Sequence, residues 1–118
     1  MDKEIKRGDV VIVDLDPIRG SETGKTRPCV IIQNDIGNKY SPVTIVAVIT
    51  SQKEISKEYP TDVWVSRGDG KLNKDSIIQC DQIRTITKER IKDIIGRFDQ
   101  EQMDKVDKAL KISLGLYL

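Results

Sequence analysis

The run VTIVAVIT (Val43–Thr50) decides the fold. It is apolar and β-branched almost throughout, which predicts a central strand buried in a sheet. Shorter strand-like runs lie on both sides, separated by loops rich in Gly, Pro, Asn and Asp. They are Asp9–Leu15, Pro28–Gln33, Thr61–Ser66 and Ser76–Ile86, the last with a bend near Asp81. Several short strands spaced in this way predict a small antiparallel barrel or sandwich.

The C-terminal third has helical patterns. Thr87 is placed to cap a short helix over residues 88–95, with Gly96 near its end. Asp99 and Gln102 form a D-x-x-Q capping box. An apolar stripe follows at Met103, Val106, Leu110 and Leu114, and Gly115 is placed to end the helix. With no repeat or linker, the pattern predicts one α+β domain over residues 1–118.

Composition narrows the chemistry. Twenty basic and 19 acidic residues give a net charge of +1, so any nucleic-acid contact relies on a local patch. The chain has no histidine, which excludes His-based triads, papain-like sites and His-based ribonuclease chemistry. Cys29 and Cys80 lie in apolar runs and are expected to be reduced core residues, and we expect neither a metal nor a cofactor.

The chain shows no targeting or membrane signal. Its N-terminus is charged from the second residue, and it has no apolar run of the roughly 18 residues that a membrane helix needs. These features predict a cytoplasmic location and no membrane contact.

The loop RGSETGKTRP (Arg19–Pro28) has the look of a phosphate-binding loop. Its glycines, Gly20 and Gly24, enclose three residues where a P-loop needs four, and the loop leads into a strand. A P-loop is therefore excluded. Arg27, just before Pro28, is either an ordinary surface arginine or a planar clamp for an anion.

Other polar residues also have two interpretations. Thr50 either finishes its strand as a β-former or presents a hydroxyl at the barrel mouth. Glu22 is a solvated carboxylate, a general base or a partner of Arg27, and Ser21 bonds the loop backbone or contacts phosphate. The segment 34–38 indicates a turn, and the polar loop Ser51–Pro60 is a flexible connection or a substrate gate. Tyr40 and Trp64 either stack on bases or, as we expect for Trp64, pack on the barrel.

Taken in order, these motifs resemble the MazF/PemK family of toxin endoribonucleases, particularly its Gram-positive branch. The resemblance runs from about Lys6 to Leu116. The matching segments are RGDV, DLDP, GSE, RP, VIIQND, the IT at the end of the central run, SIIQCDQIRTI and MDKVDKALKISLGL. It implies a small SH3-like antiparallel barrel with a C-terminal helix, a homodimer, and a cognate antitoxin with an acidic C-terminal segment. It also implies metal-independent cleavage of single-stranded RNA, leaving a 2′,3′-cyclic phosphate and a 5′-hydroxyl.

The resemblance also assigns residues. Arg27 and Thr50 match the family's catalytic pair, and Ser21 and Glu22 match residues that line the site, with Glu22 as the hypothesised base. Gln82 and Arg84 match a segment that borders the RNA groove, and we place Asn34 and Asp81 among the RNA-binding residues. The loop sequence ETGKT and the aspartate at position 81 depart from relatives, so the cleavage motif is expected to differ. The alternative is a non-catalytic binding barrel or a gyrase-poisoning toxin of the same fold.

Overall fold

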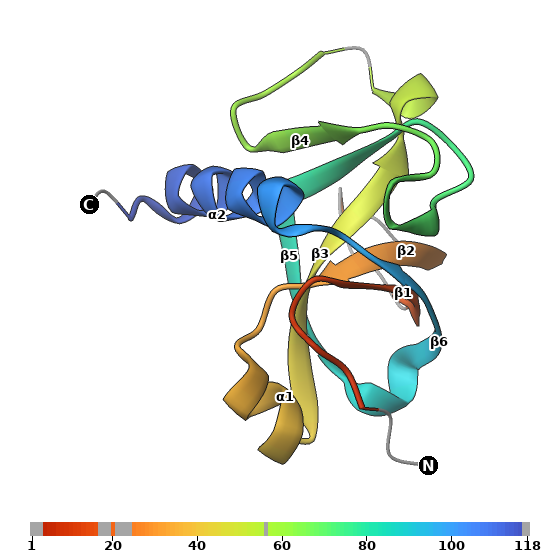
Figure 1. Cartoon of the computed structure of the whole chain (residues 1–118), viewed down its shortest axis with the longest axis vertical. Helices are drawn as coiled ribbons and strands as arrows, with labels where there is room; N and C mark the ends of the chain where they lie inside the picture. Colours follow the sequence, from red (N-terminus) through yellow and green to blue (C-terminus); the bar gives the residue numbers. More distant parts are fainter. Residues whose placement is uncertain (1–3, 17–19, 21–24, 56, 117–118) are drawn as a thin grey trace.

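The computed structural model describes residues 4–16, 20, 25–55 and 57–116. Six antiparallel strands form one curled sheet in the order β4-β5-β3-β2-β1-β6 (Figure 1). The strands are β1 (Asp9–Asp14), β2 (Thr26–Ile31), β3 (Val43–Ser51), β4 (Asp62–Val65), β5 (Ser76–Thr87) and β6 (Ile91–Arg97). Two helices, α1 (Asp35–Tyr40) and α2 (Gln100–Leu114), and three short 3₁₀ turns complete the described chain: η1 (Gln52–Glu54), η2 (Asp69–Lys71) and η3 (Lys88–Arg90).

β3 is central because both of its faces are buried. Val46 and Val48 pack into one apolar cluster, while Ala47 and Ile49 pack into a second cluster beneath α2. Successive side chains of a strand point to opposite faces, so a strand between two cores is apolar on both faces. This confirms the interpretation of Val43–Thr50, and a single curled sheet favours the barrel over the sandwich.

β5 changes direction in its middle. It pairs with β3 along its length, but the register shifts between Ala47 and Val48, which lie opposite Ile83 and Gln79. The residues between them, Cys80–Gln82, therefore have no partner in that register. Extra residues on one strand bend it and increase its twist. The predicted bend near Asp81 is confirmed.

The helix predicted over residues 88–95 is wrong. Lys88–Arg90 form the 3₁₀ turn η3, and the chain then enters β6, which pairs with β1. The β1 edge offers backbone partners to a segment rich in β-branched isoleucine, and Ile91 is fully buried there. A long-range pairing has overridden a local helical pattern.

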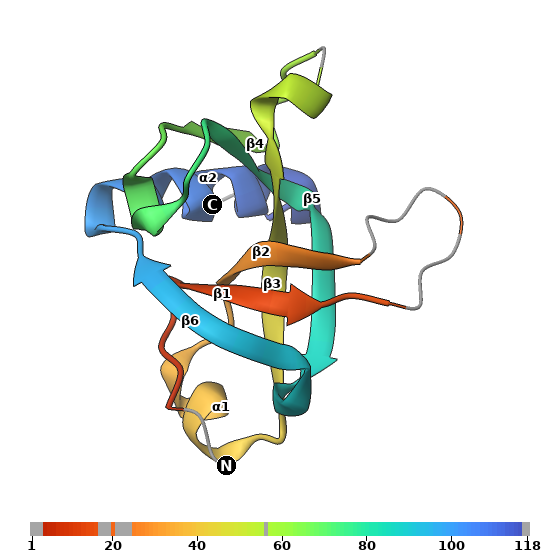
Figure 2. The same ribbon diagram turned by 90° about the vertical axis from the view of Figure 1, so that its right-hand side faces the viewer.

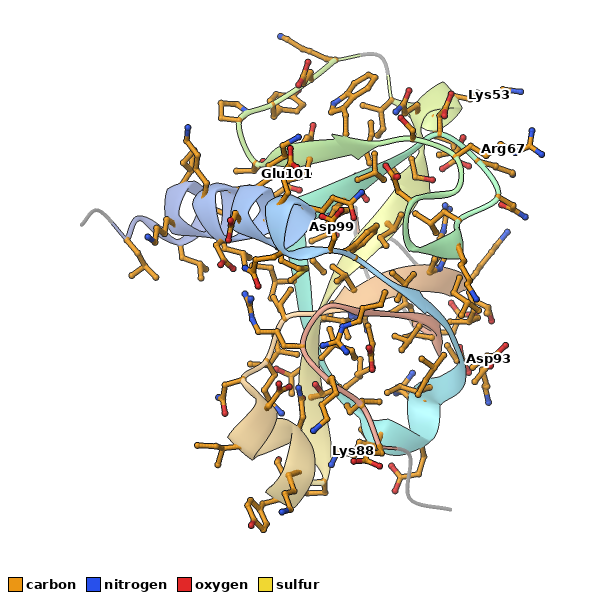
Figure 3. The ribbon with its side chains drawn as sticks, in the orientation of Figure 1. Lys53, Arg67, Lys88, Asp93, Asp99 and Glu101 are labelled. Atoms are coloured by element: carbon orange, nitrogen blue, oxygen red, sulfur yellow. The ribbon has the colours of Figure 1, made fainter. Side chains whose placement is uncertain are left out.

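α2 confirms the predicted C-terminal helix. Both halves of the capping box between Asp99 and Gln102 are formed, and Gly115 adopts a left-handed conformation with φ 70° at the C-cap. Asp99 and Glu101 both lie at the N-terminal end of this helix (Figure 3). The buried stripe is Met103, Val106 and Ala109, whereas Leu114 is 57% exposed, so the stripe ends earlier than predicted.

The segment predicted as a turn at residues 34–38 is instead the start of α1. Asn34 caps this short helix, because its side chain accepts a hydrogen bond of 2.8 Å from the backbone N–H of Gly37. Among the described residues, no helix is long and apolar enough to cross a membrane.

Candidate functional site

Strand register makes Arg27 and Thr50 neighbours. Cys29 of β2 lies opposite Val48 of β3. Two residues further along each antiparallel strand, the same register sets Arg27 opposite Thr50. Residues directly opposite each other have side chains on the same face of the sheet. Accordingly, Arg27 Nη1 lies 3.4 Å from Thr50 Oγ1.

A third side chain, that of Glu54, completes this cluster. The Thr50 hydroxyl donates to Glu54 Oε2 over 2.6 Å, and Arg27 Nη1 forms an ion pair with the same oxygen at 3.1 Å. These two hydrogen bonds, the first from Thr50, hold the pKa of the Glu54 carboxyl below its usual range. The Thr50 and Arg27 groups thus converge on one anionic oxygen. We call the point where they converge the anion position.

The cluster lies at the barrel rim, half in solvent. Thr50 is only 5% exposed, while the Arg27 and Glu54 side chains are 29% and 54% exposed. A guanidinium and a hydroxyl held together at a partly dry surface suit a phosphate, because charge-assisted hydrogen bonds are stronger than neutral ones.

The turn η1 fixes where Glu54 begins. The Gln52 N–H donates to Asp75 O, and its side-chain amide donates to Val65 O and Ser76 O, at 3.1 to 3.3 Å. The Ser51 hydroxyl accepts from the Lys53 N–H at the start of the turn. Lys53 itself extends outward from η1 (Figure 3). The backbone of η1 is therefore anchored, while the Glu54 side chain reaches back towards Thr50.

Cys29 lies two residues after Arg27 on the same face of β2, but it takes no part as a nucleophile. It is fully buried, and burial raises the pKa of its thiol to about 12, although the Arg84 charge opposes this shift. Since the thiolate is the reactive form, this cysteine is inert at neutral pH. The expectation of a reduced core cysteine is confirmed for Cys29 and Cys80, which are both buried and free.

Ser21 and Glu22 lie outside the described residues, as does most of their loop. The two ends of that loop are held together: Leu15 N–H donates to Lys25 O at 2.9 Å, and Lys25 N–H donates to Asp16 Oδ1 at 2.8 Å. Their predicted roles stay predictions.

The predicted groove residues divide between two places. Asp81 and Gln82 lie on the bend of β5, exposed and half-exposed. Arg84 lies opposite Val46 and donates to Leu15 O at 3.0 Å, so it supports the base of the loop that carries Ser21 and Glu22.

Asn34 does not join the Arg27–Thr50 cluster. It caps α1, and α1 and η1 lie at opposite ends of β3 (Figure 2). Six residue steps from Thr44 to Thr50 correspond to about 20 Å of strand. A direct role for Asn34 in RNA binding remains a prediction for a ligand long enough to span that distance.

Among the described residues, no three His, Cys, Asp or Glu side chains come together as metal ligands. The aromatic candidates are surface groups: Tyr40 ends α1 and is largely exposed, and Trp64 on β4 is 40% exposed. Trp64 is therefore less completely packed on the barrel than expected.

Sequence reasoning missed Glu54. The loop after β3 is mostly polar, and its several charged residues gave no reason to select one of them. The available signal was spacing: a carboxylate four residues after the hydroxyl that ends the strand, which a single tight turn brings back to that hydroxyl.

Comparison with known proteins gives a consistent result. Residues 6–114 match the family model described as PemK-like, MazF-like toxin of type II toxin-antitoxin system. The chain is 52% identical over 112 residues to the endoribonuclease EndoA of Bacillus subtilis, covering 95% of this chain and 96% of that protein.

Solved structures with low sequence identity share the fold. MazF from Deinococcus radiodurans superposes with a TM-score of 0.82 at 20% identity, covering 98% of this chain and all of that one. An endoribonuclease from a mycobacterial species, in complex with its cognate antitoxin, gives 0.79 at 24% identity over 97% and 98% of the two chains. These matches support the barrel with a C-terminal helix as the architecture.

Proposed function

The chain belongs to the PemK/MazF family of toxins from type II toxin–antitoxin systems. On that premise we propose that it is an endoribonuclease that cleaves single-stranded RNA, and that Arg27 and Thr50 are its catalytic residues. The observation that carries this proposal is the convergence of Arg27 Nη1 and Thr50 Oγ1 on one anionic oxygen. The same two donors would hold a non-bridging oxygen of the scissile phosphate.

The reaction suits a site without histidine. The ribose 2′-hydroxyl loses its proton to a base and forms a bond to phosphorus, and the bond from phosphorus to the 5′-oxygen breaks as that oxygen gains a proton. The products are a 2′,3′-cyclic phosphate and a 5′-hydroxyl. The protein must chiefly stabilise the negative charge on the crowded phosphorane.

Arg27 and Thr50 supply that stabilisation. The guanidinium carries a delocalised positive charge and five N–H donors but no acceptor, so it stabilises negative charge and does not serve as a free base. Thr50 donates a directional hydrogen bond from a position that its buried strand fixes. The base is hypothesised to be Glu22, as the family resemblance implies.

The proposal extends to partners and location. A cognate antitoxin with an acidic C-terminal segment would cover the RNA groove, and two copies of the chain would form a homodimer in the cytoplasm. The single domain over residues 1–118 is part of the same proposal. Support comes from the family match over residues 6–114.

The test is cleavage of a long, weakly structured RNA in excess EDTA, with the ends mapped. Wild type is expected to make discrete cuts with cyclic-phosphate and 5′-hydroxyl ends. Arg27→Ala and Thr50→Val are each expected to lower the rate by about 10²–10³, the usual cost of losing one such donor. Thr50→Ser keeps the hydroxyl and should retain most of the activity.

Lys111→Ala, which removes a positive charge from the last turn of α2, serves as the control and should cut like wild type. RNA left intact by a folded wild-type protein would contradict the proposal. That result would favour the non-catalytic barrel module or a gyrase-poisoning toxin.

A further inference from the structure

We propose that Glu54 is an internal competitor for the scissile phosphate, so that free phosphate binds the site more weakly than it would without Glu54, while a ligand that brings further contacts, such as an RNA chain, still binds. This inference rests on the proposed function, because it concerns the same anion position. It makes Glu54 a residue that sets the affinity of the site for anions and that contacts both members of the predicted catalytic pair.

The geometry leaves room for one anion. Glu54 Oε2 accepts from Thr50 Oγ1 at 2.6 Å and from Arg27 Nη1 at 3.1 Å. A phosphate oxygen held by the same two donors would occupy the same point. Two anions in contact also repel each other, so the carboxylate has to leave before phosphate binds.

Leaving is feasible because the contact is anchored at one end only. The η1 backbone is held through Gln52, but the Glu54 side chain is 54% exposed and can rotate into water without moving the turn. Such exposed ion pairs contribute little to stability. The competition is therefore shallow, equivalent to about a three- to tenfold loss of phosphate affinity.

A competition this shallow weakens the binding of the small anion without preventing RNA from binding. Inorganic phosphate offers only what Glu54 already supplies to Arg27 and Thr50, so it gains little by displacing the carboxylate. An RNA chain adds contacts to its flanking nucleotides and can offset the loss. The competitor lowers the affinity of both ligands by the same factor, but free phosphate has no other contact to make up the loss.

The test titrates inorganic phosphate at constant ionic strength into wild type, Glu54→Gln and Glu54→Ala. Binding is followed by ¹H–¹⁵N NMR at the Thr50 amide and the Arg27 side chain. Both variants are expected to bind phosphate about three- to tenfold more tightly than wild type. Glu58→Gln, an exposed glutamate in the same loop, removes the same charge and should bind like wild type.

The double variant Arg27→Ala/Glu54→Gln tests whether the tighter phosphate binding occurs at the anion position. It should lose phosphate binding. Unchanged phosphate affinity in both single variants at position 54 would overturn the proposal. A fall in kcat of a hundredfold or more in Glu54→Gln, with phosphate affinity unchanged, would also overturn it and assign Glu54 as the base.

Phosphate titration does not depend on cleavage, so the two proposals fail separately. If no variant cuts RNA but removal of Glu54 tightens phosphate binding, the competitor stands and the ribonuclease assignment fails. If wild type cuts RNA but phosphate affinity is the same in wild type and in the Glu54 variants, the ribonuclease proposal stands and the competitor proposal fails.

Discussion

At the scale of single residues, the two cysteines are, among the described residues, the titratable groups whose pKa is shifted most by burial. The pKa of each thiol rises to about 12 from an ordinary value of 9.0, mainly because burial penalises the thiolate. Near Cys80, the negative charges of Asp62, Asp81 and Asp107 act in the same direction. Both thiols therefore stay protonated in the folded protein at a pH where an exposed thiol ionises.

This difference predicts that the protein loses stability in alkali. The folded state holds the thiol protons more tightly than the unfolded state, so the stabilisation is complete below about pH 8.5 and is lost as pH rises towards 12. Urea unfolding from pH 7.5 to 10.5 should show wild type losing about 1 kcal/mol per pH unit per thiol, relative to Cys29→Ala/Cys80→Ala. The free energy of unfolding of each protein is compared with its own value at pH 7.5. This comparison removes the pH-independent cost of the cavities that the two alanine substitutions leave. Parallel curves for the two proteins would contradict the prediction.

The predicted catalytic residues show what could be found from the sequence. Arg27 and Thr50 belong to short motifs at strand ends, and antiparallel register brings them together without any loop conformation being known. Glu54 depends on a tight turn and on Gln52 anchoring it to the ends of two other strands. No local pattern in a polar loop encodes such an anchor, so this contact required the structure.

At the scale of elements, the transition from β6 into α2 depends on one close approach. Gly96 of β6 passes so near η2 that an added Cβ would lie 2.2 Å from the carbonyl oxygen of Gly70. That atom belongs to backbone and cannot swing aside as a side-chain tip would. The same contact explains why the helix predicted over residues 88–95 is wrong. Gly96 was expected near the end of that helix, but its missing side chain instead allows β6 to pack against η2.

Gly96→Ala is therefore expected to destabilise the protein by about 3 kcal/mol or more, since overpacking against fixed backbone forces the strand to shift. Gly115→Ala is the matched control. Its φ is 70°, but an added Cβ there meets nothing within 4 Å, so it should cost only about 1 kcal/mol. Thermal and urea unfolding of both variants measures the difference. Equal losses would show that the Gly70–Gly96 approach relaxes freely.

Other elements could be predicted because the sequence patterns that specify them are local. The capping box of α2 needs only Asp99 and Gln102, and the doubly buried β3 follows from its uninterrupted apolar run. The segment at Ile91–Arg97 carries a pattern compatible with either state, and its partner β1 lies about 80 residues earlier. Where local preference is ambiguous, the distant pairing decides.

At the scale of the whole molecule, the near balance of charge sets how RNA is held. With 20 basic and 19 acidic residues, the chain has no general attraction for a polyanion. We therefore expect RNA binding to depend on a few cations near the anion position. Three candidates lie near that position. Arg27 is part of it, Lys53 extends outward from η1, and Lys74 is close enough for its charge to act on Glu54.

A count of about three phosphate contacts predicts a shallow salt dependence. For single strands, log K falls with log salt by about 0.7 for each contact, so the expected slope is about −2. Fluorescence anisotropy with a 2′-O-methylated RNA, which has no free nucleophile, measures the slope between about 50 and 300 mM KCl. Arg27→Ala should reduce its magnitude by about 0.7, while Lys111→Ala on α2 should leave it unchanged. A slope steeper than about −5 would mean that cations far from the anion position also bind RNA phosphates. RNA affinity would then come from a broad surface of the protein and not from the contact with Arg27 and Thr50.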